Sequence, residues 1–288
     1  MNKTRLSISI VTGRSGENME RCIKLLPAAI EGVDCSLSLI ITKNCTEWEL
    51  ASLLQKYCPD AEIIRNQKPA GFGANHNAAV LKREDDYALI LNDDIELAPR
   101  SIATMISFAE AHPKGALFGP VLYPGSWEAG WIPAGGRLGE RIPKPLLTSV
   151  SLLCRSIFGS GAIRNFLVRR SAGLPPKDEQ RAYISGACCL VRRSYIAANG
   201  LYDPDYYMYY DDIDLGHRAR QAGWECWQVS AAKVMHLEGG SFSPRTWSWI
   251  MASTRRYAQK YHGATVRAAS SILISLARLV LRLKGVRT

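Results

Sequence analysis

The final fifty residues of the sequence contain no acidic residue, because the last acid of the chain is Glu238. Residues 245–288 nevertheless contain nine bases, and an earlier segment, residues 137–193, contains eleven bases against three acids. The net charge of +10 therefore comes from these two segments, and the remainder of the chain is acidic. Positively charged segments of this kind indicate that the protein binds an anionic surface or ligand. The alternative is a basic protein face that is simply solvated.

The sequence also lacks any pair of cysteines in the C-x-x-C spacing, although it contains eight cysteines. Cys188 and Cys189 are adjacent in an apolar run, where both side chains cannot easily face one metal ion. The pattern is typical of buried thiols in a protein from a reducing compartment.

No run of about 18 apolar residues occurs, so the sequence predicts no membrane-spanning helix. The first residues, MNKTRLSISIVTG, contain only a short apolar stretch interrupted by Ser7 and Ser9, which does not resemble a signal peptide.

Residues 266–288 predict an amphipathic helix with an apolar side and a basic side. The apolar side carries Ile272, Leu273, Leu276, Leu279, Val280 and Leu283, and the other side carries Arg267, Ser271, Ser275, Arg278 and Arg282. Such a helix suits the surface of an anionic membrane, and docking on the protein itself or on a partner is the alternative.

The first 125 residues alternate short apolar runs of β type with helical patterns. Strands are predicted at 6–12, 37–42, 62–65, 88–92 and 116–122, and helices at 18–30, 47–57, 73–82 and 101–111, the second with a capping box of Thr46 and Glu49. Later strands are predicted at 183–192 and 226–229. This alternation predicts an α/β fold, a Rossmann-like and mostly parallel sheet with helices on both faces. We expect one domain at 1–243, with a loop-rich insert at 125–182, and a basic helical tail at 244–288.

Polar residues follow several predicted strands at the edge where ligands of such sheets bind. The strand in LILNDDIEL ends in Asn92, Asp93 and Asp94, whose oxygens suit Mg²⁺ or Mn²⁺ together with substrate phosphates, although such residues also begin turns. His236 follows another strand pattern and precedes two glycines.

The densest acidic cluster, YYDDIDL, lies at the start of a predicted helix. A helix dipole stabilises a carboxylate at this position, so we expect an ionised aspartate there, available as a base at neutral pH. For Asp211 and Asp214, helix capping or pairing with Arg218 is the alternative.

Together these segments resemble the family-2 glycosyltransferases of GT-A fold, and among them the rhamnosyltransferase-like enzymes of bacterial cell-surface glycan assembly. The resemblance covers residues 6–122 and 183–243. It is carried by NQKPAGFGANHNAAV, by LILNDDIEL in the place of the family's metal-binding D-x-D, and by SGACCLVRRSYIAANGLYDPDYYMYYDDIDLGHRARQAGW followed by VMHLEGGS.

The resemblance implies a role for each matching residue. Asp212 is the implied catalytic base, and Asp94 with His236 the implied metal site for Mg²⁺ or Mn²⁺. The implied binding residues for the nucleotide-sugar donor are Thr12, Thr42, Gly71, Asn75, Asn92, Asp93 and Asp211. One departure is ITKNCTE, in which Thr42 replaces the acid that commonly contacts the nucleotide base in this family, so the base remains open.

The resemblance thus implies an inverting enzyme that uses a dTDP- or UDP-linked sugar and a glycan or polyprenyl-diphosphate-linked acceptor. We expect it in the cytoplasm, peripheral on the inner face of a bacterial plasma membrane, with no nucleic acid as partner. A metal-dependent nucleotidyltransferase and a non-catalytic protein that binds anionic glycolipid are the alternatives.

Overall fold

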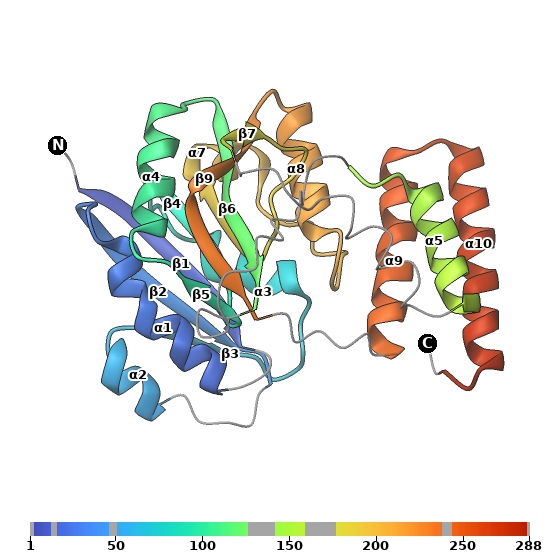
Figure 1. Cartoon of the computed structure of the whole chain (residues 1–288), viewed down its shortest axis with the longest axis horizontal. Helices are drawn as coiled ribbons and strands as arrows, with labels where there is room; N and C mark the ends of the chain where they lie inside the picture. The colour runs from blue at the N-terminus through green and yellow to red at the C-terminus, as the bar shows by residue number, and fades with distance from the viewer. Residues whose placement is uncertain are drawn as a thin grey trace.

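The computed structural model describes residues 3–12, 16–45, 51–125, 142–158, 177–237 and 244–286. These residues form an α/β part built on one sheet and a layer of three helices beside it (Figure 1). The capping box at Thr46 and Glu49, and most of the predicted insert, lie outside the described residues.

The sheet has nine strands in the order β3-β2-β1-β4-β8-β6-β9-β5, with β7 paired to β9. Neighbouring strands are parallel from β3 to β4 and between β6 and β9, and antiparallel elsewhere. The strands are β1 (Thr4–Thr12), β2 (Cys35–Lys43), β3 (Glu62–Arg65), β4 (Tyr87–Asn92), β5 (Ile95–Leu97), β6 (Gly115–Pro124), β7 (Glu179–Gln180), β8 (Cys188–Arg192) and β9 (Glu225–His236).

Helices cover both faces of the sheet because successive strand residues point to opposite sides. Leu89 and Leu91 of β4 belong to a core with α1 (Gly16–Ile30), α2 (Ala51–Tyr57) and α4 (Ser101–Ala111). Ala88 and Ile90 belong to a second core with α3 (Phe72–Val80), α7 (Arg193–Asn199) and α8 (Asp211–Gln221). The predicted α/β architecture is confirmed.

Several elements differ from the sequence predictions, and among them strand β7 and helix α7 were not predicted. Strand β5 was not predicted, β8 begins at Cys188 instead of 183, and β9 continues to His236 instead of ending at 229. Helix α5 (Pro145–Phe158) lies in the segment predicted to be loop-rich. Its prolines misled the prediction, since Pro145 occupies the first helical position, where a missing N–H costs nothing.

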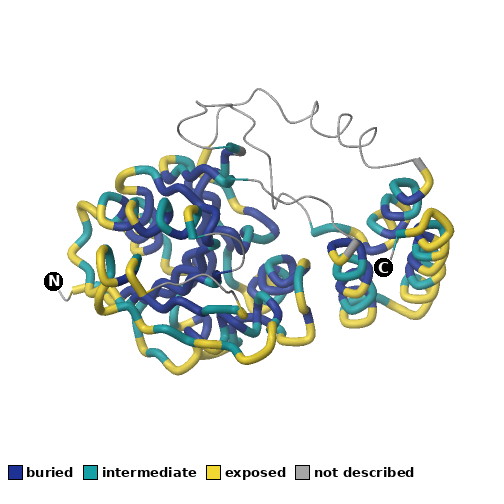
Figure 2. Tube along the Cα trace, turned by 90° about the horizontal axis from the view of Figure 1, so that it is seen from below, coloured by how far each residue is buried: buried dark blue, intermediate teal, exposed yellow. Residues whose placement is uncertain are grey.

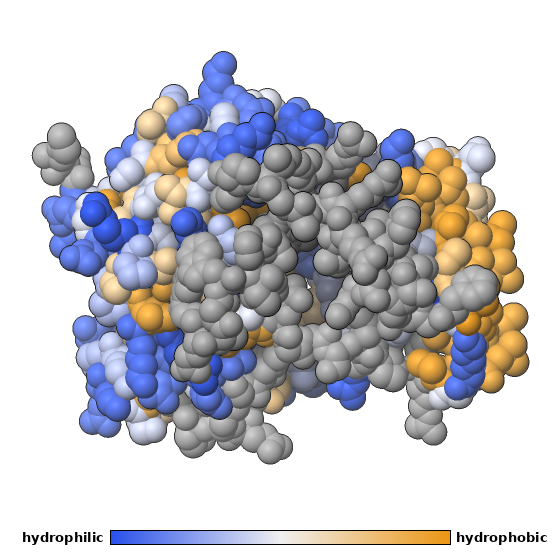
Figure 3. Space-filling model, viewed as in Figure 1, coloured by the Kyte–Doolittle hydropathy of each residue, from blue (hydrophilic) through white to orange (hydrophobic). Residues whose placement is uncertain are grey.

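The helical layer consists of α5, α9 (Pro244–Tyr261) and α10 (Ala264–Leu283). Their shared core includes Leu152, Trp247, Met251, Ile274 and Leu281. On the outer side of this layer residues are exposed (Figure 2), and Figure 3 shows a hydrophobic surface where Figure 1 places α5 and α10.

Helix α10 is long and apolar enough to cross a membrane, judged by length and composition alone. The stretch contains Ala, Ser and Arg residues, so it is not an unbroken apolar run, and the absence of a membrane-spanning helix stays a prediction. Only 22% of its apolar window is buried, whereas the core helix of a globular domain is mostly buried.

Candidate active site

Asp94 and His236 meet at the end of the β5–β9 pair. Ile95 pairs with His236, and the Leu237 N–H donates to the Asp94 carbonyl at 3.0 Å. As a result, Nε2 of His236 lies 3.3 Å from Oδ1 of Asp94. Asp94 and Asp93, in the turn between β4 and β5, are both buried. The pairing of these strands brings together the two predicted metal ligands.

Three predicted donor-binding residues lie at the carboxyl ends of neighbouring parallel strands. Val11 of β1 is paired with Thr42 on one side and Asn92 on the other, so these side chains share one face of the sheet. Thr12 is the next residue along β1 and therefore faces the other way. Both threonines are fully buried, and no hydrogen bond to Oγ1 of Thr42 occurs in the described part of the chain.

Asn75 and Gly71 are engaged within the protein. The Asn75 amide accepts from Nδ2 of Asn66 at 2.7 Å and donates to the Ala70 carbonyl at 3.2 Å. A Cβ atom on Gly71 would lie 2.7 Å from the carbonyl oxygen of Tyr207. These two residues shape the loop before α3, and their contact with a donor stays a prediction.

Asp212 lies in the first turn of α8 and is half-buried. Its Oδ1 accepts from the Ile213 N–H at 2.8 Å, and its Oδ2 accepts from the Gly186 N–H at 3.4 Å. Burial raises the pKa of Asp212 to about 6, against the opposing effect of these backbone hydrogen bonds. The carboxyl is therefore mostly ionised at neutral pH and can accept a proton from a weakly acidic group.

Asp211 behaves differently from its neighbour. Burial, together with the charge of Asp212, raises the pKa of Asp211 to about 8, against the opposing effect of backbone N–H groups of Gly73 and of Asp211 itself. The expected ionised aspartate at neutral pH agrees with Asp212 but not with Asp211, and the pKa of both acids is raised. The loss of hydration on burial outweighs the helix dipole.

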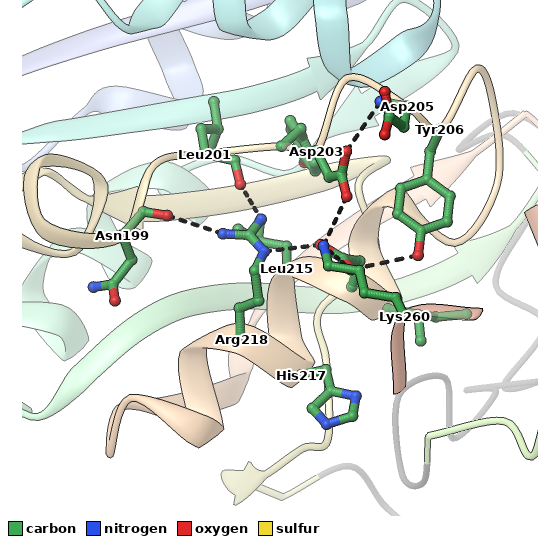
Figure 4. A network of polar contacts seen from close by, with 12 residues as sticks. Asn199, Leu201, Asp203, Asp205, Tyr206, Leu215, His217, Arg218 and Lys260 are labelled. Atoms are coloured by element: carbon green, nitrogen blue, oxygen red, sulfur yellow. Dashed lines mark hydrogen bonds and ion pairs between the residues drawn. The ribbon is translucent and has the colours of Figure 1, made fainter. Parts of the chain in front are cut away.

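Asp214 is the centre of a polar network that joins α8 to α9. Figure 4 shows two of its partners, Arg218 and Lys260. The Asp214 carboxylate is fully buried and contacts Nε of Arg218 at 2.8 Å, Nζ of Lys260 at 2.8 Å and the hydroxyl of Tyr261 at 2.7 Å. The predicted pairing with Arg218 is confirmed, whereas side-chain capping is not found, since the N-cap residue is Tyr210. Lys260 also reaches Asp203 at 2.7 Å.

The segment before α8 has an uncommon backbone. Tyr209 and Tyr210 have φ values of 69° and 66°, the left-handed region that residues with side chains rarely adopt. The helical layer holds this segment, because Thr148 of α5 accepts from the Tyr210 hydroxyl and Ser253 of α9 donates to the Met208 carbonyl. Strain of this kind is common at functional sites, and the sequence gives no direct signal of it.

Asn92 and Asp212, two of the predicted site residues, are linked through the residues just before β8. Ala187 accepts from the Asn92 N–H at 2.9 Å, and the preceding residue, Gly186, donates to Asp212. A Cβ atom on Gly186 would lie 2.9 Å from the Phe72 ring. Sequence reasoning did not single out Gly186, although it lies within the quoted SGACC.

A model of the family described as Glycosyl transferase family 2 matches residues 7–199. The chain belongs to glycosyl transferase family 2. This family-2 glycosyltransferase is 26% identical over 258 residues to the N-acetylglucosaminyl-diphospho-decaprenol L-rhamnosyltransferase of Mycobacterium tuberculosis, an alignment that covers 82% of this chain and 77% of the relative. It is 27% identical over 207 residues to rhamnosyltransferase WbbL of Escherichia coli, covering 65% of this chain and 69% of the relative.

The glycosyltransferase is also similar in fold to a crystal structure of GalNAc-T7 with UDP, GalNAc and Mn²⁺. The TM-score is 0.58 at 12% identity, and the match covers 99% of this chain and 57% of that chain. At this identity the likeness supports the GT-A fold alone.

A divalent cation at Asp94 and His236 needs ligands from elsewhere. Within the described residues, no group of three or more His, Cys, Asp or Glu side chains is placed to hold a metal ion. One carboxylate with an imidazole beside it fits a site completed by substrate phosphate oxygens and water, as is usual for Mg²⁺. The residues thus fit a cation that binds together with the donor.

Proposed function

We propose that this glycosyltransferase moves a sugar, with inversion at the anomeric carbon, from a nucleoside-diphosphate donor to a glycan or polyprenyl-diphosphate-linked acceptor. The observation that carries the proposal is the environment of Asp212, a half-buried carboxylate with a pKa of about 6 and two backbone N–H donors. Inversion by single displacement needs one base and no enzyme nucleophile, and a single positioned carboxylate meets that need.

The proposed reaction has two demands at the reacting centre. The acceptor hydroxyl must lose its proton as it attacks, and Asp212 accepts that proton. The departing nucleoside diphosphate must be stabilised as negative charge develops on it. Asp94 and His236 would hold a divalent cation at the diphosphate, and the cation supplies the opposing charge.

The donor and acceptor classes come from the named relatives. Both are rhamnosyltransferases, and the mycobacterial name specifies an acceptor that carries a diphosphate and decaprenol. We extend these classes to the present chain, with dTDP- or UDP-linked sugars as donors, in the synthesis of a bacterial cell-surface polysaccharide. All eight cysteines are free thiols, which supports a reducing compartment such as the cytoplasm.

A donor screen tests the proposal. The full chain is incubated with dTDP- and UDP-linked sugars, L-rhamnose first, and with N-acetylglucosaminyl-diphospho-polyprenol in detergent. We expect release of nucleoside diphosphate with one donor and a product whose new anomeric configuration, read by NMR, is opposite to that of the donor. Release of pyrophosphate would instead identify a nucleotidyltransferase. Binding of anionic glycolipid without turnover of any donor would identify a binding protein.

A further inference from the structure

Helix α10 exposes a stripe of large apolar side chains on the side opposite to its packing surface. Ser270, Ile274, Ala277 and Leu281 are buried against the rest of the helical layer. The exposed residues follow a spacing of four, three and four, which places them on one side of the helix, and they are Ile272, Leu276, Leu279 and Leu283. Leu283 is 80% exposed and Ile272 is 61% exposed. The helix is thus apolar on two opposite sides, and only one of them is covered by the protein.

Helix α5 extends the exposed stripe. Leu146, Leu147, Val150 and Ile157 are exposed on it. The two helices are joined at one end, since Nζ of Lys284 donates to the carbonyls of Ser156 and Ile157 at 2.8 and 2.7 Å. In Figure 3 the hydrophobic colour is continuous over this part of the molecule. We call the eight exposed apolar residues of α5 and α10 the α5–α10 face.

Basic residues that form no ion pair in the described chain lie beside this face. Of the eight bases in residues 245–286, only Arg256 and Lys260 pair with acids in the described chain. Their partners are Asp203, Asp205 and, for Lys260, Asp214 of α8. The described bases outside those pairs are Arg245, Arg255, Arg267, Arg278, Arg282 and Lys284. Helical spacing places Arg267, Arg278 and Arg282 together on the side of α10 next to the exposed stripe. An apolar face beside such a row of bases is complementary to lipid chains under anionic headgroups.

Arg255 of α9 adds to this positive region. Its guanidinium donates to Oγ of Ser275 at 2.8 Å and to the Ser271 carbonyl at 3.3 Å, which holds it over the basic side of α10. Burial lowers the pKa of Arg255, and the neighbouring positive charge of Arg278 lowers it further. Two guanidinium groups held this close favour an anion between them, such as a lipid phosphate.

The alternative is that α10 crosses the membrane. The packing of its buried side within the helical layer argues against this. Crossing would require α10 to leave Trp247, Met251 and Leu152, with which it forms the core of the helical layer. It would also place Arg278, which lies inside the helix, in the bilayer interior, where a guanidinium is costly. A helix that lies parallel to the membrane in the interface keeps its packing within the helical layer. It also leaves Arg278 at the level of the headgroups.

We infer that the α5–α10 face docks the enzyme on an anionic phospholipid bilayer. The inference deepens the proposed function, because an acceptor on a polyprenyl chain is held in such a bilayer. It adds α5 to the surface, which the sequence alone did not indicate. Binding to lipid without acceptor is nevertheless measurable separately from sugar transfer.

Vesicle sedimentation tests the inference with the full chain. Protein partitioning is measured on phosphatidylglycerol–phosphatidylcholine vesicles and on phosphatidylcholine vesicles without anionic lipid. The first variant, L276S/L279S/L283S, removes exposed leucines only, and we expect its partitioning on anionic vesicles to fall at least about tenfold. Its control is L37S/L81S, which changes exposed leucines of the α/β part and leaves partitioning unchanged.

The charge contribution has its own variant. In R267Q/R278Q/R282Q we expect binding to fall by about fivefold for each base removed, and the residual binding to lose most of its salt dependence. The control K56Q/K82Q/K114Q removes the same charge from exposed positions of the α/β part and leaves binding near normal. Deleting α10 is a poorer test, because it also uncovers the core of the helical layer.

The outcomes separate this inference from the proposed function. Unchanged binding by the leucine variant, with its fold verified by circular dichroism, would overturn the inference. So would a leucine-dependent dimer in analytical ultracentrifugation without vesicle binding, because a second copy would then cover the face. If vesicles bind as expected but no donor is turned over, the proposed function fails and the docking surface remains.

Discussion

The α/β part buries most of its large apolar side chains, whereas the helical layer leaves many of them exposed. In the α/β part, the sheet residues Leu6, Ile8, Ile10, Leu89 and Leu91 are fully buried between the sheet and the helices on that face. In the helical layer, α5 and α10 leave eight large apolar side chains exposed. The charges differ in the same way, since the acids of the site lie in the α/β part, and α9 and α10 contain no acid. One part is built to place a few carboxylates, and the other presents a surface.

The two parts are nevertheless connected at the site. Lys260 and Tyr261 of α9 contact Asp214, which lies two residues after the proposed base. Thr148 of α5 contacts Tyr210, which directly precedes α8. The start of α8, which carries the proposed base, therefore packs against the helical layer.

Removal of divalent cations is expected to have the largest effect. EDTA should abolish sugar transfer, and Mg²⁺ or Mn²⁺ should restore it, because the leaving diphosphate needs an opposing charge. Asp94→Ala should weaken binding of both donor and Mn²⁺, measured by calorimetry, whereas Asp178→Ala, outside the site, should not. Full transfer in the presence of chelator would show that basic side chains neutralise the diphosphate instead.

Loss of the proposed base should be the next largest effect. Asp212→Asn keeps the size of the side chain but cannot accept a proton, so turnover should fall at least about 10²-fold while donor affinity stays nearly unchanged. In the native enzyme turnover should rise with pH through about 6, as Asp212 ionises, and the variant should lack this rise. Asp60→Asn, an exposed change away from the site, is the control. Near-native turnover would assign the base elsewhere.

The two parts should also differ in how much stability they lose when a glycine is replaced by alanine. In α8, a Cβ atom on Gly216 would lie 2.6 Å from Cα of Tyr183 and 2.7 Å from the Ala182 carbonyl oxygen, so Gly216→Ala should cost about 1–3 kcal/mol of unfolding free energy. Gly263, before α10, has open space at this position and a negative φ, so Gly263→Ala should change stability little. Urea unfolding measures both, and equal losses would contradict the described packing.

The change in stability between pH 6 and pH 7 should be the smallest effect. Asp211 keeps its proton up to about pH 8 in the folded state but loses it near pH 4 when unfolded, so rising pH favours the unfolded state between these values. This carboxyl lowers the unfolding free energy by up to about 1.4 kcal/mol per pH unit. In Asp211→Asn that contribution should disappear from urea unfolding at pH 6 and 7. An unchanged slope would show that Asp211 is ionised in the folded protein.

The succession of strands and helices along the first 125 residues was predictable, because apolar runs and helical patterns alternate there. The contact of Asp94 with His236 was expected from resemblance, but its cause was not, since β5 has only three residues and pairs with a strand far along the chain. Helix α5 was missed because two prolines and several bases dominate its surroundings.

The acidity of Asp211 and Asp212 was beyond local reasoning for a physical reason. A helix dipole is visible in sequence, because it depends on where a helix begins. Burial depends on Gly73 and Gly186, which bring distant backbone against the start of α8. The larger of the two effects is therefore the one that only the fold reveals.

Helix α9 fixes the distance between the proposed base and the α5–α10 face. Its last turns bond to the helix of the proposed base, and its first turns pack against α10, so no flexible loop separates the base from the α5–α10 face. If that face rests on a bilayer, the base stands at a fixed height above the lipid. The enzyme would then modify acceptor sugars that lie at this distance from the bilayer. It would not modify sugars further along a growing glycan. The distance of a sugar from the bilayer, rather than contacts with each sugar of the chain, would then select the acceptor length.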